Sequence, residues 1–357
     1  MNRAKNDLLK KLFPVFIVFF LFSTAFPVFL VASEPSQEKV QITEINLVRY
    51  EATLASSAQL PKDYMKIPFG SKDQEVGGTD QDPEHFTNGI PSAFFPQSDG
   101  SVWILDSVNS SLKLFNSAGK FVSKIPLELS SSKNKILIKD FSVVHPDEFY
   151  VYSDLDGLVK RIASNGKTIV EIEGLNSSLS IGTDPKGNVL VKNPALTGVL
   201  RFNPAGEIIE QYTNQYNLST YCDTNGNPYG IKGDNDQIAI LYKATNASPV
   251  KEITMASFSL EFPIEKNIHI VNREILGTDQ QGNIYIELVA CDDPGIIHLN
   301  RFYKLSPEGQ TLATLNFLTP PSVISPDLPR HMVVTGDGKI MTFTVDSTSY
   351  GLVTYSF

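Results

Sequence analysis

The chain has 357 residues, of which 41% are hydrophobic and 19% are charged, and its formal net charge is −9. It is too apolar to be disordered and long enough to bury a large core. The acidic balance argues against nucleic acid and anionic membrane surfaces as partners, because lysine and arginine supply the affinity for both. Frequent glycines and prolines, 23 and 22 in number, favour many short elements and an all-β fold.

The N-terminus has the pattern of an export signal. A basic segment precedes residues 12–33, which carry no charged side chain, and this order is typical of a signal peptide. The uncharged run is also long enough to cross a bilayer, which requires about 20 apolar residues. We therefore expect a secreted or extracytoplasmic protein, with residues 1–33 either removed as a signal peptide or kept as a membrane anchor.

A turn followed by an apolar strand recurs six times in the remaining chain, as in DGSVWIL and QGNIYIE. The copies begin at Asp99, Pro146, Lys186, Asn225, Gln281 and Asp337. In the first three copies a second glycine turn follows the first turn at a constant spacing of 19 residues, at Gly119, Gly166 and Gly206. Turns that favour a positive φ, placed between apolar strands, predict a four-stranded antiparallel meander in each copy.

Six such sheets bury both of their faces only when they pack radially against one another, as in a β-propeller. We therefore predict an all-β, six-bladed propeller of four-stranded antiparallel blades over residues 34–357. The predicted blades span approximately residues 91–130, 138–175, 178–216, 220–262, 269–318 and 330–357. The last copy supplies only three strands, so the strand-like N-terminal segment 39–50 is predicted to complete it and close the ring.

Residues 92–122, SAFFPQSDGSVWILDSVNSSLKLFNSAGKFV, resemble the NHL-type repeat and the related six-bladed TolB-like propellers of secreted bacterial proteins. In these repeats a DG turn leads into a strand that ends in Asp and is followed by Asn; the later copies keep the turn but lose both residues. The resemblance implies a non-catalytic binding or assembly module for a protein, peptide or glycan of the cell envelope. The alternative that it implies is a calcium-assisted hydrolase, lactonase or lyase.

In such propellers the loops between second and third strands lie on the face that usually carries the function. The candidate ligand-binding residues in or beside these loops are Asp106, Asn109, Asp154, Asp156, Asp234, Asp236, Asp292 and Asp293. A ring of carboxylates could hold Ca²⁺ or a cationic ligand, although aspartate is also a common turn residue. The five histidines take different positions relative to the repeat, so no zinc site made of three histidines is expected.

The segment 211–221, QYTNQYNLSTY, adds Tyr212, Tyr216 and Tyr221 to the candidates. Tyrosine rings among amide and hydroxyl side chains suit sugar or peptide recognition, although the rings could instead be half-buried at strand ends. Cys222 and Cys291 are the only cysteines, and export would permit a disulfide between them. Two free thiols are the alternative. Motifs of serine nucleophiles, phosphate loops and HExxH metal sites are absent from the sequence.

Overall fold

The described part of the chain consists of strands, turns and short connecting segments, without a helix. The computed structural model describes residues 43–48, 59–78, 89–127, 138–145, 148–154, 156–175, 180–193, 198–213, 215, 217–261, 267–293, 297–317 and 330–357. Within these ranges no helix is long and apolar enough to span a membrane, and the predicted signal or anchor, residues 1–33, lies outside them. Residues Val40–Phe357 form one unit.

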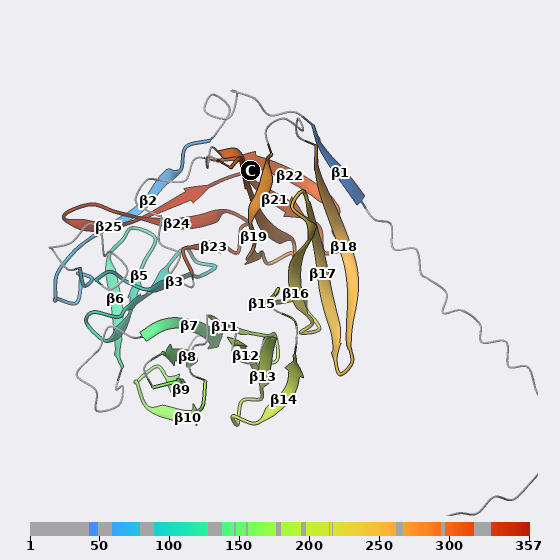
Figure 1. The fold of residues 1–357 in the computed structure, drawn as a ribbon. Helices are drawn as coiled ribbons and strands as arrows, with labels where there is room; N and C mark the ends of the chain where they lie inside the picture. Colours follow the sequence, from blue (N-terminus) through green and yellow to red (C-terminus); the bar gives the residue numbers. More distant parts are fainter. Residues whose placement is uncertain are drawn as a thin grey trace, which may run out of the picture. The chain divides into compact units, whose positions relative to one another are not determined.

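Six sheets, each with four antiparallel strands, are arranged in a ring, so the predicted six-bladed propeller is confirmed (Figure 1). The first three blades contain β3 (Ala93–Pro96), β4 (Val102–Asp106), β5 (Ser111–Phe115) and β6 (Phe121–Pro126); β7 (Ile138–His145), β8 (Glu148–Ser153), β9 (Leu158–Ala163) and β10 (Thr168–Ile172); and β11 (Ser180–Thr183), β12 (Val189–Asn193), β13 (Gly198–Phe202) and β14 (Ile208–Tyr212). The other three contain β15 (Leu218–Cys222), β16 (Pro228–Asn235), β17 (Ile238–Ala247) and β18 (Val250–Glu261); β19 (His269–Thr278), β20 (Ile284–Cys291), β21 (Ile297–Leu305) and β22 (Thr311–Asn316); and β23 (Met332–Val334), β24 (Ile340–Val345) and β25 (Ser349–Tyr355).

The first turns of the first and third blades show why the repeated glycine is needed. Gly100 has a φ of 81° and its N–H closes the turn on the Gln97 carbonyl oxygen at 3.1 Å. Gly187 repeats this conformation in the third blade, with a φ of 78°. Glycine adopts positive φ without steric cost, so it reverses the chain between the innermost two strands.

Apolar side chains from neighbouring blades share common core clusters. Trp103 of the first blade packs edge-on against Phe149 of the second, with ring centroids 4.9 Å apart. Both residues belong to a buried cluster that also contains Leu105 and Phe141. Each blade therefore buries its faces against the next one, as the repeat predicted.

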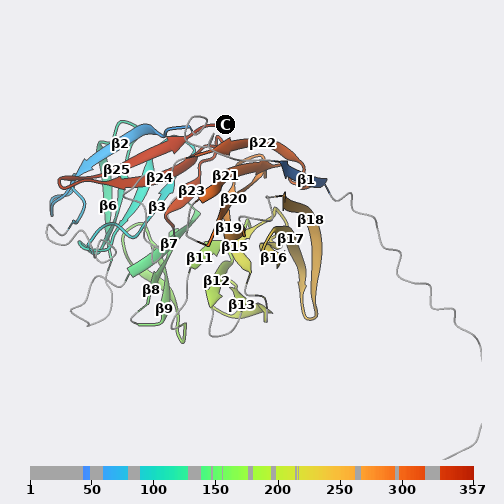
Figure 2. The same cartoon turned by 45° about the horizontal axis from the view of Figure 1, so that its top comes forward.

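The ring is closed by an N-terminal strand, but by a different one from that predicted. Strand β2 (Lys62–Pro68) pairs antiparallel with β25 and supplies the fourth strand of the last blade. Strand β1 (Thr43–Val48), within the predicted closing segment 39–50, instead pairs in parallel with β18 as a fifth strand of the fourth blade (Figure 2). The expectation that residues 39–50 complete the last blade is therefore wrong. Both segments alternate in hydrophobicity, and alternation alone does not select between two open sheet edges.

Candidate functional site

The two ends of the ring differ, and we name them by their connections. The turn face carries the turns between first and second strands, such as residues 97–101 and 279–283. The loop face carries the connections between second and third strands and between blades. The aspartates predicted to bind a ligand lie in or beside connections of the loop face.

Asp106 and Asn109 have a structural role in the first blade. Asp106 is fully buried, pairs with the equally buried Lys113 at 2.9 Å, and accepts a hydrogen bond from the Gly77 N–H at 3.1 Å. The Asn109 amide donates to Asp106 at 2.8 Å and to the Gly70 carbonyl oxygen at 3.0 Å. These contacts attach the segment that follows β2 to the first blade, and they leave the Asp106 carboxylate with protein partners on both oxygens.

The other predicted aspartates also have partners close by in their own blades or are exposed. Asp154 accepts from the Tyr152 hydroxyl at 2.7 Å and Asp156 from the Ser153 hydroxyl at 2.9 Å. Asp234 and Asp236 are exposed near the β16–β17 turn, Asp292 pairs with His298 at 2.9 Å, and Asp293 accepts from Asn267 at 2.6 Å. Within the described ranges, none of these aspartates belongs to a group of three potential metal ligands.

The three tyrosines predicted to bind a ligand do not lie together in one described site. Tyr212 is buried beneath Arg201, and its hydroxyl donates to Glu210 at 2.9 Å, so it belongs to the core. Tyr216 lies outside the described residues. Tyr221 lies on the inner strand β15 and lines two cavities near the axis of the ring. Only Tyr221 of these candidates is therefore placed in the site described below.

Cys222 and Cys291 are free, so the predicted disulfide is not formed. Cys222 ends β15 directly before a turn of the turn face, whereas Cys291 ends β20, whose first residue Ile284 follows such a turn. The length of β20 separates the two thiols, because a strand rises about 3.3 Å per residue. A disulfide requires Cα atoms within about 7 Å. Cys222 and Cys291 therefore end their strands at opposite faces of the ring.

A channel along the axis of the ring contains two cavities. One has a volume of about 180 Å³ and is lined by the inner strands of all six blades, including Phe95, Ser142 and Val333. The other has a volume of about 150 Å³ and is lined by residues of the loop-face half, including Lys192, Arg273 and Glu274. We call the second cavity the channel mouth.

Arg330 and Tyr221 stand where the two cavities meet, because both residues line both of them. Arg330 precedes β23 of the sixth blade, yet its guanidinium pairs with the buried Asp140 of the second blade at 2.7 Å. It also donates to the carbonyl oxygen of Ile181 in the third blade. Asp140 in turn accepts the N–H of Ile181 at 2.8 Å. This network joins opposite sides of the ring and fixes the floor of the channel mouth.

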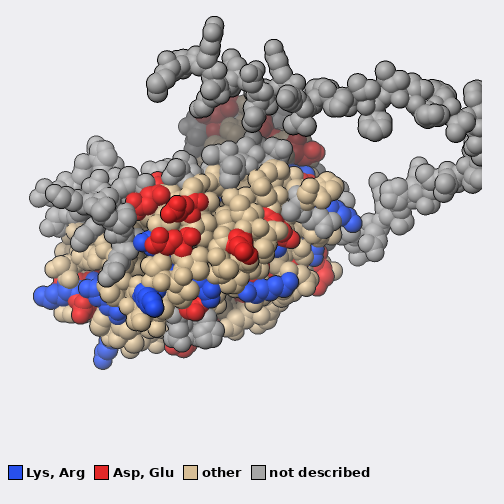
Figure 3. All heavy atoms as spheres, turned by 90° about the horizontal axis from the view of Figure 1, so that it is seen from below, with Lys and Arg blue, Asp and Glu red and all other residues tan. Residues whose placement is uncertain are grey.

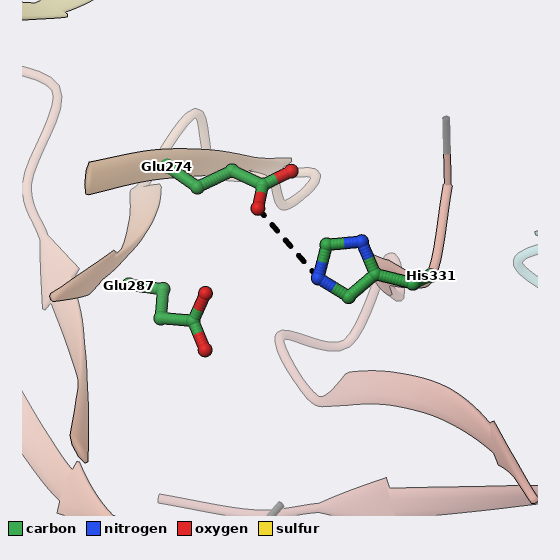
Figure 4. A group of neighbouring side chains, drawn as sticks. All are labelled: Glu274, Glu287 and His331. Carbon is green, nitrogen blue, oxygen red and sulfur yellow. Dashed lines mark ion pairs between the residues drawn. The ribbon is translucent and has the colours of Figure 1, made fainter. Parts of the chain in front are cut away.

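Three potential metal ligands lie together beside the channel mouth: Glu274 on β19, Glu287 on β20 and His331 at the start of the sixth blade (Figure 4). Their ligand atoms all lie within 4.8 Å of one another, and Glu274 and His331 form an ion pair at 3.6 Å. Glu274 and Glu287 are direct cross-strand partners in the β19–β20 register. Like charges placed directly opposite each other destabilise a sheet.

The electrostatics of this cluster are dominated by Glu287. Its side chain is buried, and burial together with the nearby Glu274 carboxylate raises the pKa of Glu287 to about 8, even though Asn272 donates to it at 2.7 Å. Burial lowers the pKa of Lys192, which the Glu274 carboxylate partly opposes. Burial also raises the pKa of the Tyr221 hydroxyl. Titratable groups with shifted pKa values at or beside one cavity are typical of functional sites.

The raised pKa of Glu287 predicts that the free energy of unfolding depends on pH. The measurement is made in EDTA, which removes any divalent ion from the glutamates. The folded protein holds this proton up to about pH 8, whereas an unfolded glutamate loses it near pH 4.5. The free energy of unfolding should therefore fall as pH rises between these values, by about 1 kcal/mol from pH 6 to pH 7. Urea unfolding should show this slope in the wild type and in the exposed control Glu308→Gln, and a flatter one in Glu287→Gln. Equal slopes in all three proteins would contradict the assignment.

A larger cavity of about 570 Å³ lies on the turn face between the fourth and fifth blades. Its carboxylates already serve the turns. Asp223 accepts from the N–H groups of Asn225 and Asn227 at 2.9 and 2.8 Å, and Asp279 accepts from the Tyr285 hydroxyl at 2.9 Å. Because these groups are satisfied within the protein, we favour the smaller channel mouth as the candidate site.

Glu274, Glu287 and His331, which we call the channel cluster, could not be recognised together in the sequence because they come from different strands and blades. The expectation against a zinc site made of three histidines does not apply to a group of one histidine and two glutamates. The available signal was the exchange of apolar for acidic residues at Glu274 and Glu287, in two strands that otherwise bury apolar side chains.

Comparison with solved structures supports the fold. A Bacteroides fragilis protein assigned as an exported protein has a TM-score of 0.52 and 12% sequence identity, covering 88% of this chain and 100% of its own. The virginiamycin B lyase of Staphylococcus aureus has a TM-score of 0.46 and 12% identity, covering 82% of this chain and 99% of its own. No protein-family model and no curated protein sequence matches the chain. At 12% identity the likeness to the Bacteroides fragilis protein establishes the propeller fold alone.

Proposed function

We propose that this protein is an exported binding module that takes a polar or negatively charged group of an envelope protein, peptide or glycan at the channel mouth. The observation that carries the proposal is Lys192. Its side chain faces this cavity, burial lowers its pKa, and no carboxylate among the described residues forms an ion pair with it. Burying an ammonium group without a paired carboxylate costs free energy in the protein without ligand. A ligand that supplies acceptor atoms forms charge-assisted hydrogen bonds with this group and so binds favourably.

The other residues of the channel mouth suit such a ligand. Ser219, Asn217 and Tyr221 offer hydroxyl and amide groups around Lys192, and Arg273 adds a second positive charge. An aromatic ring beside hydrogen-bonding groups is the usual composition of a sugar or peptide site. The ligand that fits this chemistry carries a carboxylate or several hydroxyl groups, as a peptide C-terminus or an acidic sugar does.

Export, the type of propeller and the exclusion of nucleic acid are parts of the same proposal. The basic segment followed by the uncharged residues 12–33 supports export, as does the likeness to a protein assigned as exported. Residues 92–122 support an NHL-like or TolB-like type. On the side shown in Figure 3, lysine and arginine side chains lie in separate groups among acidic and uncharged residues. A nucleic-acid site needs positive charge concentrated along the phosphate backbone.

The test compares two lysines of the same blade. Lys192→Met removes the charge in the channel mouth, whereas Lys186→Met removes an exposed charge on the turn face. Each purified variant would be used to capture partners from an envelope extract of the source cells. We expect at least tenfold less capture by Lys192→Met and unchanged capture by Lys186→Met. Equal capture by both variants, or a loss confined to Lys186→Met, would place the ligand elsewhere.

A metal-assisted hydrolase, lactonase or lyase is the second candidate function. It is favoured by the position of Glu274, since this residue both lines the channel mouth and belongs to the group with Glu287 and His331. Calcium fits this group less well than a transition metal, because calcium prefers six to eight oxygen ligands. Hydrolysis of lactone or ester substrates that is lost in Glu287→Gln would support this function over simple binding.

A further inference from the structure

We propose that Glu274, Glu287 and His331 bind one divalent transition metal ion, for which Zn²⁺ is the probe. The site does not depend on the proposed ligand, since it is argued only from the arrangement of these three side chains. Two carboxylates and an imidazole form a mixed oxygen and nitrogen donor set, which suits zinc and related ions. Figure 4 shows the three side chains reaching toward a common space from two blades.

The distances are compatible with coordination after a small movement. Ligand atoms about 2.0 Å from a tetrahedral zinc ion lie roughly 3.3 Å from one another. His331 Nε2 and Glu274 Oε2 are 3.6 Å apart, and all three ligand atoms lie within 4.8 Å. The ligand atoms would therefore have to approach one another by about 1.5 Å or less to reach this geometry. The remaining coordination positions would be open to water or ligand.

The burial of Glu287 is an independent argument for a cation at this position. Its side chain is only 4% exposed and lies directly across the strand pair from Glu274. Among the described residues, no lysine or arginine forms an ion pair with either glutamate, and Asn272 is the one side chain that donates to Glu287. The Glu274 side chain is 36% exposed, so the buried Glu287 carboxylate is the costly one, and a proton or a cation beside it relieves that cost. A bound divalent ion would supply two positive charges at this position.

Asn272 has the place of a supporting residue. It lies on β19, two positions before Glu274, and its amide holds one oxygen of Glu287 at 2.7 Å. This hydrogen bond orients Oε2 of Glu287. No described residue donates a hydrogen bond to Oε1, the other oxygen of this carboxylate. Outer hydrogen bonds of this kind fix the orientation of metal-ligating carboxylates.

Isothermal titration of the purified, EDTA-treated full chain with ZnCl₂ tests the site. We expect one zinc ion per chain in the wild type and at least tenfold weaker binding in Glu287→Gln and in His331→Gln. His298→Gln is the matched control, because His298 also pairs with a carboxylate, that of Asp292. It should bind zinc as the wild type does.

Two further readouts keep the result interpretable. Thermal melts followed by circular dichroism should show that all variants fold, and that zinc raises the melting temperature of the wild type and His298→Gln but not of Glu287→Gln. Co²⁺ in place of Zn²⁺ should give visible absorption that is lost in His331→Gln. No saturable binding by the wild type, or equal binding by folded wild type and Glu287→Gln, overturns the proposal. Since no envelope ligand is present, this outcome is separate from the capture test.

Discussion

A chain that lacks residues 1–69 should be roughly 5 kcal/mol or more less stable than a chain that lacks only residues 1–58. The larger deletion removes β2, which buries Met65 and Ile67 against the last blade and hydrogen-bonds along β25. Losing one such buried side chain typically costs 2–5 kcal/mol. The Tyr64 hydroxyl of β2 also donates to the Gly100 carbonyl oxygen at 2.5 Å and so links the last blade to the first.

The smaller deletion removes β1, which pairs only along the outer edge of the fourth blade. Urea unfolding followed by tryptophan fluorescence would compare the two shortened chains with the full chain, because Trp103 lies in the first blade.

In the full chain, Ile67→Ala should cost about 3 kcal/mol of unfolding free energy. The control Val122→Ala, at a side chain 52% exposed on an outer strand, should have little effect. Equal unfolding midpoints for the two shortened chains would mean that β2 does not close the ring.

Lys113→Met should destabilise the protein by about 3–5 kcal/mol. Lys113 and Asp106 have fully buried side chains that pair at 2.9 Å, and the Lys113 ammonium also donates to the carbonyl oxygens of Lys72 and Glu75 at 3.1 and 2.5 Å. Removing the lysine leaves the Asp106 carboxylate buried without its counter-charge and frees the segment around Glu75. The loss should be much larger than that of a surface ion pair.

Lys66→Met is the matched control, because it breaks an ion pair with Asp346 in which both side chains are largely exposed. Urea unfolding at pH 7 should show a large loss for Lys113→Met and a much smaller one for Lys66→Met. The double variant Lys113→Met/Asp106→Leu should recover part of the loss, since it removes both buried charges. A Lys113→Met protein as stable as the control would contradict the structural role of Asp106 and reopen it as a ligand-binding residue.

The six-bladed fold could be predicted because its signal is local and repeated. Each blade carries a turn that needs glycine or a small polar residue, followed by strands whose apolar residues face the neighbouring blades. The local sequence does not show, however, with which sheet edge an N-terminal strand pairs. β1 and β2 both have the alternation of an edge strand, and their partners β18 and β25 are fixed only when the ring has formed.

The channel cluster could not be predicted by counting along strands. Strand β19 has irregularities between Ile270 and Asn272 and between Ile275 and Gly277, and these shift which side chains face the axis. His331 reaches the cluster from the next blade, which sequence spacing does not encode. The prediction that Asp106 binds a ligand rested on its place at the end of a strand. The structure instead pairs Asp106 with Lys113 on the neighbouring strand of the same hairpin.

The central claim is that the functional chemistry of this propeller lies at the channel mouth rather than in the aspartate-bearing loops. A crystal of the protein soaked in ZnCl₂ and measured at the zinc absorption edge tests it directly. We predict one strong anomalous peak between Glu274, Glu287 and His331. A peak at Asp292 and His298 with none in the channel would contradict the account.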